Sequence, residues 1–344
     1  MKAVYLTSHG KPDSLTVGFF DDPTPASGEI VVRMATASVN HVDLYMRDSG
    51  VGIRHSLPLV MGVDGAGTVE DCNGQQEWKR GDRVVIFPAV YCGRCRQCVA
   101  GEQILCDTVG FLGENRHGTF GEYVAIPSAN LFRAPDALKL SEIAAVPVAY
   151  LTAWRMLFSK GGLGPGQKVL IFGIGGGVSL AALQLAKLAG ADVAVTSTSL
   201  GKRQRALDYG ADYAWSTDDD VVAEVMRWTG RSGVDLVIDN VGKATWGKGL
   251  RSLKKGGSIV CCGATSGGDP PADLQRLFVR QIAVMGSSLA NPSDFDRLLA
   301  VIASGRLRPV IDRSFALDEV VDALARIENR EQFGKVTLRI SESE

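Results

Sequence analysis

The chain has 344 residues, 45% of them hydrophobic and 22% charged, a composition typical of a globular protein of about two domains. Its 37 Lys and Arg residues balance 38 Asp and Glu residues, so the net charge of -1 offers no basic footprint for nucleic acid or an anionic membrane. The opening MKAVYLTSHGKPDS lacks the apolar run of a signal peptide, and the sequence lacks the roughly 18-residue apolar stretch of a membrane helix, so we expect a soluble, cytoplasmic protein.

Short strand-like segments follow one another through about residue 130. Apolar and polar residues alternate in them, and glycine, proline and aspartate separate them, which predicts a β-rich region. The expected strands cover residues 2–6, 28–39, 65–72, 81–90 and 118–127.

From about Leu151 the pattern changes to strands that alternate with helices. Expected strands cover 168–172, 192–198, 234–242 and 258–265, and the helices between them include 178–189, 201–212 and 221–230. This alternation predicts βαβ units and therefore an α/β domain with a doubly wound parallel sheet. After about Met285, two amphipathic helices (293–305 and 317–330) and a strand (335–340) end the chain.

A glycine-rich turn joins the first strand of this region to its first helix. Glycines there allow a tight turn and let backbone N–H groups approach a pyrophosphate at the helix N-terminus, so the motif predicts dinucleotide binding. A purely structural βα turn is the alternative, and Ser179 stands where a third glycine is usual. The predicted contacts are Gly173, Gly175, Gly176, Gly177 and Val178.

The end of the following strand indicates which nucleotide is bound. Enzymes that use NAD hold the ribose 2′-hydroxyl with an acid at this point. Here Asp192 precedes the strand and would lie more than ~10 Å away, whereas Thr198, Ser199 and Lys202 follow it. Hydroxyls with a cation suit a 2′-phosphate, so we expect NADPH, although Lys202 could instead belong to a solvated helix turn.

Four cysteines fall within fifteen residues, in the pattern C-x2-C-x2-C-x7-C. Four thiolates at this spacing predict one structural zinc ion, whose closed tetrahedral shell leaves no position for a substrate. A disulfide pair needs an oxidising compartment, and an iron–sulfur cluster usually carries a trailing proline, so both alternatives are weaker. The predicted ligands are Cys92, Cys95, Cys98 and Cys106.

The cysteine cluster, the glycine turn and the motif Gly62-Val-Asp-Gly-Ala-Gly67 together resemble the medium-chain dehydrogenase/reductase superfamily over nearly the whole chain. The resemblance implies a GroES-like catalytic domain (1–149, zinc lobe about 90–110) completed by 288–344, and a Rossmann domain (150–287). It also implies a homodimer or homotetramer. Further cofactor contacts implied by local motifs are Thr152, Val241, Gly242, Gly263, Ala264 and Lys335.

The catalytic zinc of that superfamily's alcohol dehydrogenases has no matching ligand set here. Its three ligand positions match Asn40, Val63 and Val148, and valine cannot bind zinc. Asn40, Asp43 and Tyr45 instead resemble the quinone oxidoreductase branch, which works without catalytic zinc but commonly lacks the cysteine lobe. The chain therefore looks like a hybrid of the two branches.

The predicted reaction is hydride transfer from NADPH to a small carbonyl-conjugated acceptor, a quinone or an enone. Asn40 and Tyr45 are the expected hydrogen-bond donors to the acceptor oxygen, and Asp43 and Asp64 are expected to orient them. His41 is expected to be structural. An alcohol dehydrogenase with an unusual catalytic metal and a non-catalytic NADPH-binding protein are the alternatives.

Overall fold

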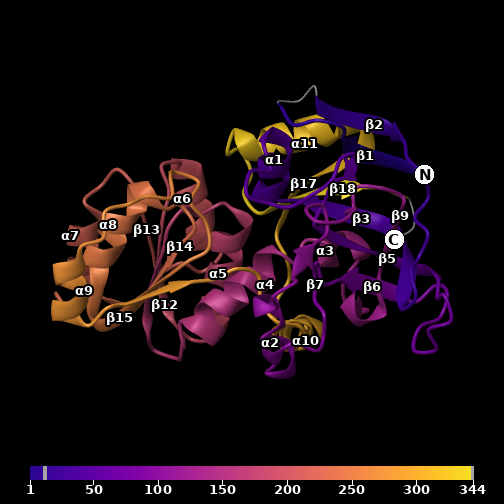
Figure 1. The fold of residues 1–344 in the computed structure, drawn as a ribbon. Helices are drawn as coiled ribbons and strands as arrows, with labels where there is room; N and C mark the ends of the chain where they lie inside the picture. Colours follow the sequence, from indigo (N-terminus) through magenta and orange to yellow (C-terminus); the bar gives the residue numbers. More distant parts are fainter. Residues whose placement is uncertain (11–13, 342–344) are drawn as a thin grey trace. The chain divides into compact units, whose positions relative to one another are not determined.

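The computed structural model describes residues 1–10 and 14–341. Contacts divide the chain into two units, Met1–Val148 with Asn291–Glu344, and Ala149–Ala290 (Figure 1). The sequence placed these boundaries after residues 149 and 287, within three residues of the observed positions. Among the described residues, every helix is too short or too polar to cross a membrane.

The first unit is built on a long, mostly antiparallel sheet whose central strand is β3 (Glu29–Val39). On one side β3 pairs with β5 (Asp64–Asp71), on the other with the C-terminal strand β18 (Lys335–Arg339), and its beginning pairs with β9 (Tyr123–Pro127). In this register Ser38 is opposite Asp64, and Val39 is opposite Val336. The pairing thus brings three distant sequence segments together at the end of β3.

The other elements of this unit complete its sheets and cover them. The strands are β1 (Lys2–Leu6), β2 (Leu15–Phe19), β4 (Leu59–Val60), β6 (Arg83–Ile86), β7 (Ala89–Val90), β8 (Gly110–Phe111), β10 (Leu131–Arg133) and β17 (Ile311–Ala316). The helices are α1 (His41–Asp48), α2 (Arg96–Val99), α3 (Leu140–Ile143), α10 (Pro292–Ala303) and α11 (Val320–Glu328).

Helix α11 shows why this unit holds together. Its residues Val320, Ala323, Leu324 and Ile327 recur at the spacing of one helix face, and all four are buried. They join one apolar cluster with residues of α1, β1, β3 and β18. The C-terminal return is therefore a part of the core of the first unit.

The second unit is a parallel sheet in the order β13-β12-β11-β14-β15-β16. Its strands are β11 (Lys168–Ile171), β12 (Asp192–Thr196), β13 (Tyr213–Trp215), β14 (Val234–Asp239), β15 (Leu253–Cys261) and β16 (Ala283–Gly286). Its helices are α4 (Ala149–Trp154), the π-helical turn η4 (Arg155–Lys160), α5 (Gly177–Leu188), α6 (Leu200–Asp208), α7 (Val221–Trp228), α8 (Lys243–Ser252) and α9 (Leu274–Arg280). The order reverses between β11 and β14, and ligands of such sheets bind at this reversal, beyond the carboxyl ends of the strands.

The α/β fold class, with a GroES-like unit and a Rossmann sheet, is confirmed, but several element bounds differ from the sequence prediction. The strand expected at 118–127 begins only at Tyr123, because the backbone N–H groups of residues 118–120 bond the carbonyls of residues 60–62 rather than those of β3. The strand expected at 81–90 is interrupted before β7, at Pro88, which has no N–H for the sheet. Helix α1 was not predicted.

Candidate functional site

The glycine turn connects β11 to α5 and needs its glycines. Gly173 and Gly175 have positive φ angles of 72° and 112°, a region that favours glycine over other residues. A Cβ on Gly173 would lie 2.9 Å from Cγ2 of Val241, so the turn also packs against the end of β14. Gly176 precedes α5, whose first residues are Gly177 and Val178, so free backbone N–H groups of the helix start lie beside the turn.

Ser179, where the resemblance expects a glycine, has a structural role in this turn. Its hydroxyl donates to the Phe172 carbonyl (3.0 Å) and accepts from Nδ2 of Asn240 (3.0 Å). The serine thereby ties α5 to the ends of two neighbouring strands, and the departure from the glycine pattern leaves the turn intact.

The loops that follow β14 and β15 lie at the same sheet edge. A Cβ on Gly263 would lie 2.8 Å from the Asn240 carbonyl oxygen, and one on Gly242 would lie 2.6 Å from that of Gly267. The segments Val241–Gly242 and Gly263–Ala264 therefore approach each other backbone to backbone, which only glycine permits. Thr152, the other expected contact in this unit, is buried in α4.

The end of β12 places a cation beside the glycine turn. Ser199 precedes α6 and its hydroxyl accepts from the backbone N–H of Lys202 (3.4 Å), which fixes the start of the helix. The Lys202 side chain lies across the turn, since a Cβ on Gly175 would be 3.2 Å from its Nζ. Asp192, at the opposite end of β12, forms an ion pair with Lys168 at 3.0 Å.

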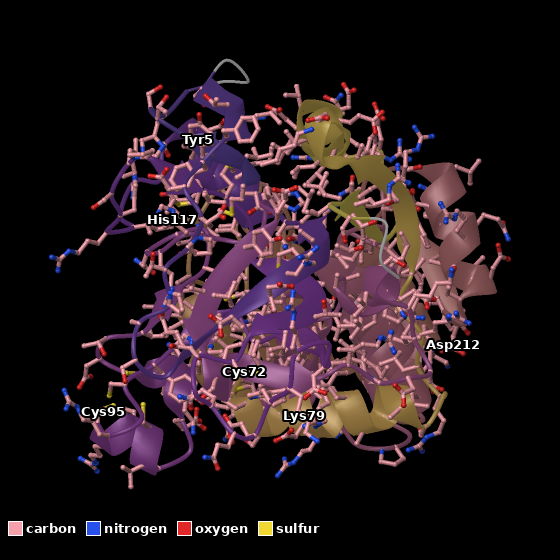
Figure 2. All side chains as sticks on the ribbon, turned by 90° about the vertical axis from the view of Figure 1, so that its right-hand side faces the viewer. Tyr5, Cys72, Lys79, Cys95, His117 and Asp212 are labelled. Atoms are coloured by element: carbon pink, nitrogen blue, oxygen red, sulfur yellow. The ribbon has the colours of Figure 1, made fainter. Side chains whose placement is uncertain are left out.

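The four cysteines of the lobe converge, and their Sγ atoms all lie within 4.8 Å of one another. Burial opposes ionisation of the Cys106 thiol, but hydrogen bonds from the backbone of Cys92 and from Thr108 outweigh it and lower its pKa to about 6. Figure 2 shows Cys95 on this lobe beside its helical turn, with Cys72 well apart from it. Thiolates in this arrangement suit a tetrahedral zinc ion.

The positions that match the catalytic zinc ligands lie around a carboxylate, that of Asp64. Asp64 follows Val63, its Oδ2 accepts from Nδ2 of Asn40 (2.9 Å), and its Oδ1 accepts from the backbone N–H of Val148 (2.8 Å). The two valine side chains present no ligand atom to this point.

The ammonium group of Lys335 is bound beside the Asp64 carboxylate. Its Nζ donates to Oδ1 of Asn40 (2.6 Å), Oδ2 of Asp64 (3.1 Å) and the Val39 carbonyl (3.1 Å), while Ser38 Oγ donates to Asp64 at 2.8 Å. The side chains of Lys335 and Asp64 are 4% and 0% exposed. All three ammonium hydrogens have acceptors, as a buried lysine requires.

This arrangement shows the partners of Asn40 and Lys335 within the first unit. Asn40 Nδ2 donates to the Ser38 carbonyl (3.2 Å) and to Asp64, and its Oδ1 accepts from Lys335, so its amide is fully used. Lys335, expected from the resemblance to contact the cofactor, directs its ammonium into the first unit. We define Ser38, Asn40, Asp64 and Lys335 as the Asp64–Lys335 cluster.

Helix α1 adds a buried acid next to this cluster. Asp43 accepts from the backbone N–H of Asn40 (2.7 Å), which caps the helix. Burial, reinforced by the negative charges of Asp64 and Glu114, raises the pKa of Asp43 to about 8 against the pull of Lys335. Burial likewise raises the pKa of Glu114 to about 7. The sequence did not single out Glu114 as a site residue, because the neighbouring residues in the sequence do not indicate that it is buried.

Tyr45 and His41 are held differently from the cluster residues. The Tyr45 hydroxyl donates to the Val51 carbonyl, and the residue is 43% exposed. Burial and the charges of Lys335 and Arg330 lower the pKa of His41, which favours its neutral form. Among the described residues, the side chain of Asn40 bonds Ser38, Asp64 and Lys335 rather than Tyr45.

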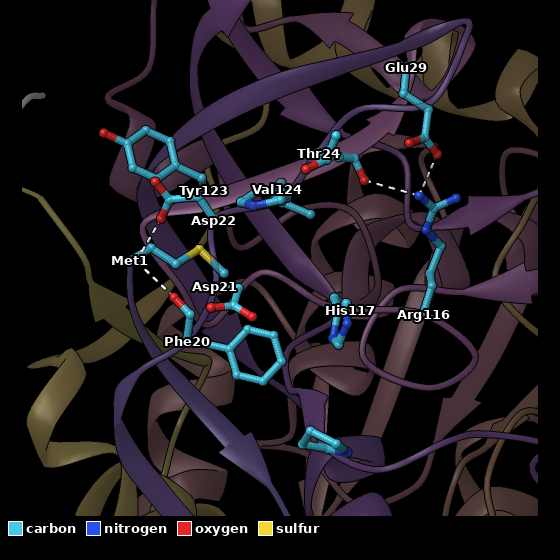
Figure 3. A pocket seen from close by; sticks show the side chains of 13 residues that line it. Met1, Phe20, Asp21, Asp22, Thr24, Glu29, Arg116, His117, Tyr123 and Val124 are labelled. Atoms are coloured by element: carbon cyan, nitrogen blue, oxygen red, sulfur yellow. Dashed lines mark hydrogen bonds and ion pairs between the residues drawn. The ribbon is translucent and has the colours of Figure 1, made fainter.

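A separate cavity of about 460 Å³ lies in the first unit (Figure 3). Four of its charged groups form two ion pairs, because the Met1 ammonium bonds Asp22 at 2.6 Å and Arg116 bonds Glu29 at 2.6 Å. His117, which also lines it, accepts from the Val60 N–H at 3.2 Å. None of the residues expected from sequence to form the site lines this cavity.

Comparisons with known proteins agree with the two-unit architecture. An alcohol dehydrogenase GroES-like domain model matches residues 26–136, and a zinc-binding dehydrogenase model matches residues 177–304. A NAD-dependent alcohol dehydrogenase of Sulfolobus acidocaldarius is 33% identical over 99% of this chain and 100% of its own. An acryloyl-coenzyme A reductase of Metallosphaera sedula is 30% identical over 98% and 99%. A solved NAD-dependent alcohol dehydrogenase superposes with a TM-score of 0.95 at 38% identity, covering 99% and 100%.

Proposed function

Because the chain belongs to the medium-chain dehydrogenase/reductase superfamily and is an oxidoreductase that uses a nicotinamide cofactor, we propose that it reduces a conjugated carbonyl, an enone or a quinone, without catalytic zinc. The observation that carries the proposal is the Asp64–Lys335 ion pair at the point where Asn40, Val63 and Val148 converge.

The chemistry of the acceptor explains the choice. Zinc alcohol dehydrogenases use the metal as a Lewis acid that lowers the pKa of the alcohol hydroxyl before hydride leaves. Two valines at the ligand positions cannot hold such a metal. A conjugated acceptor spreads the incoming negative charge over several atoms, so hydrogen-bond donors and a nearby cation can suffice. The relative named acryloyl-coenzyme A reductase acts, by its name, on a conjugated thioester.

The bound nicotinamide supplies the hydride, and this chain's own residues supply positioning, charge and a proton. The glycine turn and Lys202 hold the phosphates, while Asn40 and Asp64 hold Lys335 as a buried positive charge whose three hydrogens stay bonded within the cluster. Asp43 and Glu114 hold protons near neutral pH, since burial raises the pKa of each, so they can return the proton that balances the hydride.

We propose NADPH as the preferred cofactor, although the relatives above are named for NAD. Lys202 lies beside the glycine turn, and β12 ends without an acidic residue. A charge-assisted contact to a 2′-phosphate is worth roughly 1.5–3 kcal/mol, so Lys202→Ala should weaken NADPH binding about 10- to 150-fold and leave NADH binding nearly unchanged. Lys187→Ala, which removes a lysine paired with Asp212, is the control. Equal losses for both cofactors would contradict the assignment.

We also propose that the chain forms a homodimer or homotetramer in the cytoplasm, where four reduced cysteines are stable. The edge strand β16 and helix α9 expose Val284, Phe278 and Val279 at 42%, 71% and 58%. An apolar sheet edge invites pairing with a second copy. Light scattering of the purified protein measures the assembly directly.

The reaction itself is tested with an acceptor panel. NADPH oxidation should be fast with enones or quinones, and simple primary alcohols should be poor substrates with NADP+. Asn40→Ala should lower kcat by about 10²-fold with little change in NADPH binding, because it removes the amide that positions Asp64 and Lys335. Tyr45→Phe should have a smaller effect, since its hydroxyl bonds Val51. Unchanged turnover in the Asn40 variant would refute this site.

The second candidate is a zinc-type alcohol dehydrogenase, which the names of most of the relatives favour. It requires a metal bound at the Asp64–Lys335 cluster and simple alcohols as the best substrates. A third candidate, a non-catalytic NADPH-binding protein, requires the whole acceptor panel to be inert.

A further inference from the structure

Two histidines from separate loops of the first unit face each other at their ring nitrogens. His9 lies in the turn after β1, and His55 lies in the segment that joins α1 to β4. Their Nε2 atoms are 2.7 Å apart, and both side chains are half-buried. Neither residue belongs to the cluster, to the cysteine lobe or to the glycine turn.

The other ring nitrogens fix the protonation of this pair. His9 Nδ1 lies 2.8 Å from the Met46 carbonyl oxygen, and His55 Nδ1 lies 2.7 Å from the Ile53 carbonyl oxygen. A carbonyl oxygen can only accept, so each Nδ1 must carry a hydrogen. Two neutral rings then direct the lone pairs of their Nε2 atoms at each other. That contact is repulsive unless a cation lies between the two nitrogens.

The same geometry is typical of histidines that bind metals. A ligating histidine usually donates its other ring N–H to a backbone carbonyl or a carboxylate, which fixes its tautomer and its orientation. Both His9 and His55 meet this condition before any ion is bound. Neutral imidazole nitrogens suit Zn²⁺ and its neighbours in the transition series.

We propose that His9 and His55 form a binding site for a divalent transition metal ion such as Zn²⁺, with water completing the coordination. Tetrahedral ligation at about 2.0–2.1 Å sets the two nitrogens about 3.3 Å apart, so the half-buried rings must separate by about 0.6 Å.

The guanidinium of nearby Arg47 pairs with acidic side chains outside the pair, so it does not compete with a metal ion for the two histidines. Arg47, whose carbonyl accepts from the Gly10 N–H, directs its guanidinium to Asp48 and Glu328. Gly50 packs against both rings, since a Cβ there would lie 2.8 Å from His55 Cε1 and 3.1 Å from His9 Cε1. The metal would therefore join the turn after β1 to the segment that follows α1.

The test uses full-length protein whose cysteine lobe is already loaded with zinc, titrated with Zn²⁺ by calorimetry at pH 8. We expect one additional Zn²⁺ to bind per chain.

His9→Ala and His55→Ala should each abolish the additional binding, and the double variant should lose nothing more. His117→Ala, which removes a histidine outside the pair, should retain it. The proposal is overturned if zinc-loaded wild-type protein takes up no further Zn²⁺ at pH 8, or if the additional ion persists in both pair variants. The wild-type result decides the matter even if a variant folds poorly.

Discussion

The cysteine lobe and the Asp64–Lys335 cluster lie in the same unit but differ in the source of the positive charge that balances their acidic groups. The lobe brings four sulfur atoms within 4.8 Å of one another and needs a cation from outside. The cluster joins Asn40 and the Val148 backbone to Asp64, the residue after Val63, and it contains its own cation, the Lys335 ammonium. The comparison contrasts a site whose side chains suit an added cation with a site whose carboxylate is already paired.

The two regions also differ in solvent exposure. The lobe is partly open to solvent, with Cys92 exposed but Cys98 and Cys106 buried, whereas the cluster is sealed, with Asp64 at 0% and Lys335 at 4%. Removing one partner of a buried ion pair leaves an uncompensated charge, which is costly even where the intact pair contributes little. We therefore expect the cluster to be the more sensitive of the two to a single substitution.

The largest effect is expected for Lys335→Met. This variant leaves the Asp64 carboxylate buried without a cation and should lower the free energy of unfolding by about 3–5 kcal/mol in urea titrations. Adding Asp64→Asn should recover much of that loss. Lys2→Met, which breaks an exposed pair with Asp318, should cost less than about 1 kcal/mol. Similar losses for the two lysines would show that the cluster is not a sealed pair.

A slightly smaller effect is expected when the lobe loses a ligand through Cys95→Ser. Structural zinc contributes roughly 10–16 kcal/mol in small zinc domains, so a quarter share is about 2.5–4 kcal/mol of metal binding. Zinc affinity should fall by about 70- to 900-fold and Tm should decrease, while hydride transfer by the zinc-depleted protein that remains folded should continue. Cys72→Ser, outside the lobe, should retain its zinc. Loss of turnover in step with zinc would favour a catalytic metal.

The smallest effect, at most about 2.7 kcal/mol between pH 5 and pH 7, is a change in how the free energy of unfolding depends on pH. Burial raises the pKa of Asp43 from 3.8 to about 8, so between these values the folded chain holds a proton that the unfolded chain has released. The contribution of Asp43 is full below pH about 4 and is lost as the pH rises toward 8, by at most about 1.4 kcal/mol per pH unit.

Asp43→Asn should remove this slope and keep the oxygen that accepts from Asn40. The variant should therefore gain stability relative to the wild type between pH 5 and pH 7, measured by urea unfolding at both values. Replacing the exposed Asp218 by asparagine should leave the slope as it is. A difference between Asp43→Asn and wild type that does not vary with pH would mean that Asp43 is ionised in the folded protein.

Features that depend on residues close together in the sequence could be predicted from it. The four cysteines lie within fifteen residues, and the glycine turn lies between a strand and a helix, so local spacing was sufficient. The capping pair Asn40 and Asp43 also marks the start of α1, although that helix was not predicted. The α/β fold followed from the alternation of elements.

Contacts that depend on the pairing of strands far apart in the sequence could not be predicted. The resemblance placed Lys335 near the cofactor, and only the pairing of β18 with β3 brings its ammonium to Asn40 and Asp64. Glu114 acquires its raised pKa from burial that its neighbours in sequence do not encode. His9 and His55, 46 residues apart, carry no motif that would connect them.

The central claim is that the lobe binds zinc and the Asp64–Lys335 cluster does not. The most direct test is an anomalous-difference map from crystals of the zinc-loaded protein, recorded on both sides of the zinc absorption edge. The account predicts a peak about 2.3 Å from each of the four lobe sulfurs and none among Asn40, Asp64 and Lys335. A zinc peak within bonding distance of Asp64, with Lys335 displaced, would contradict it and establish the alcohol dehydrogenase alternative.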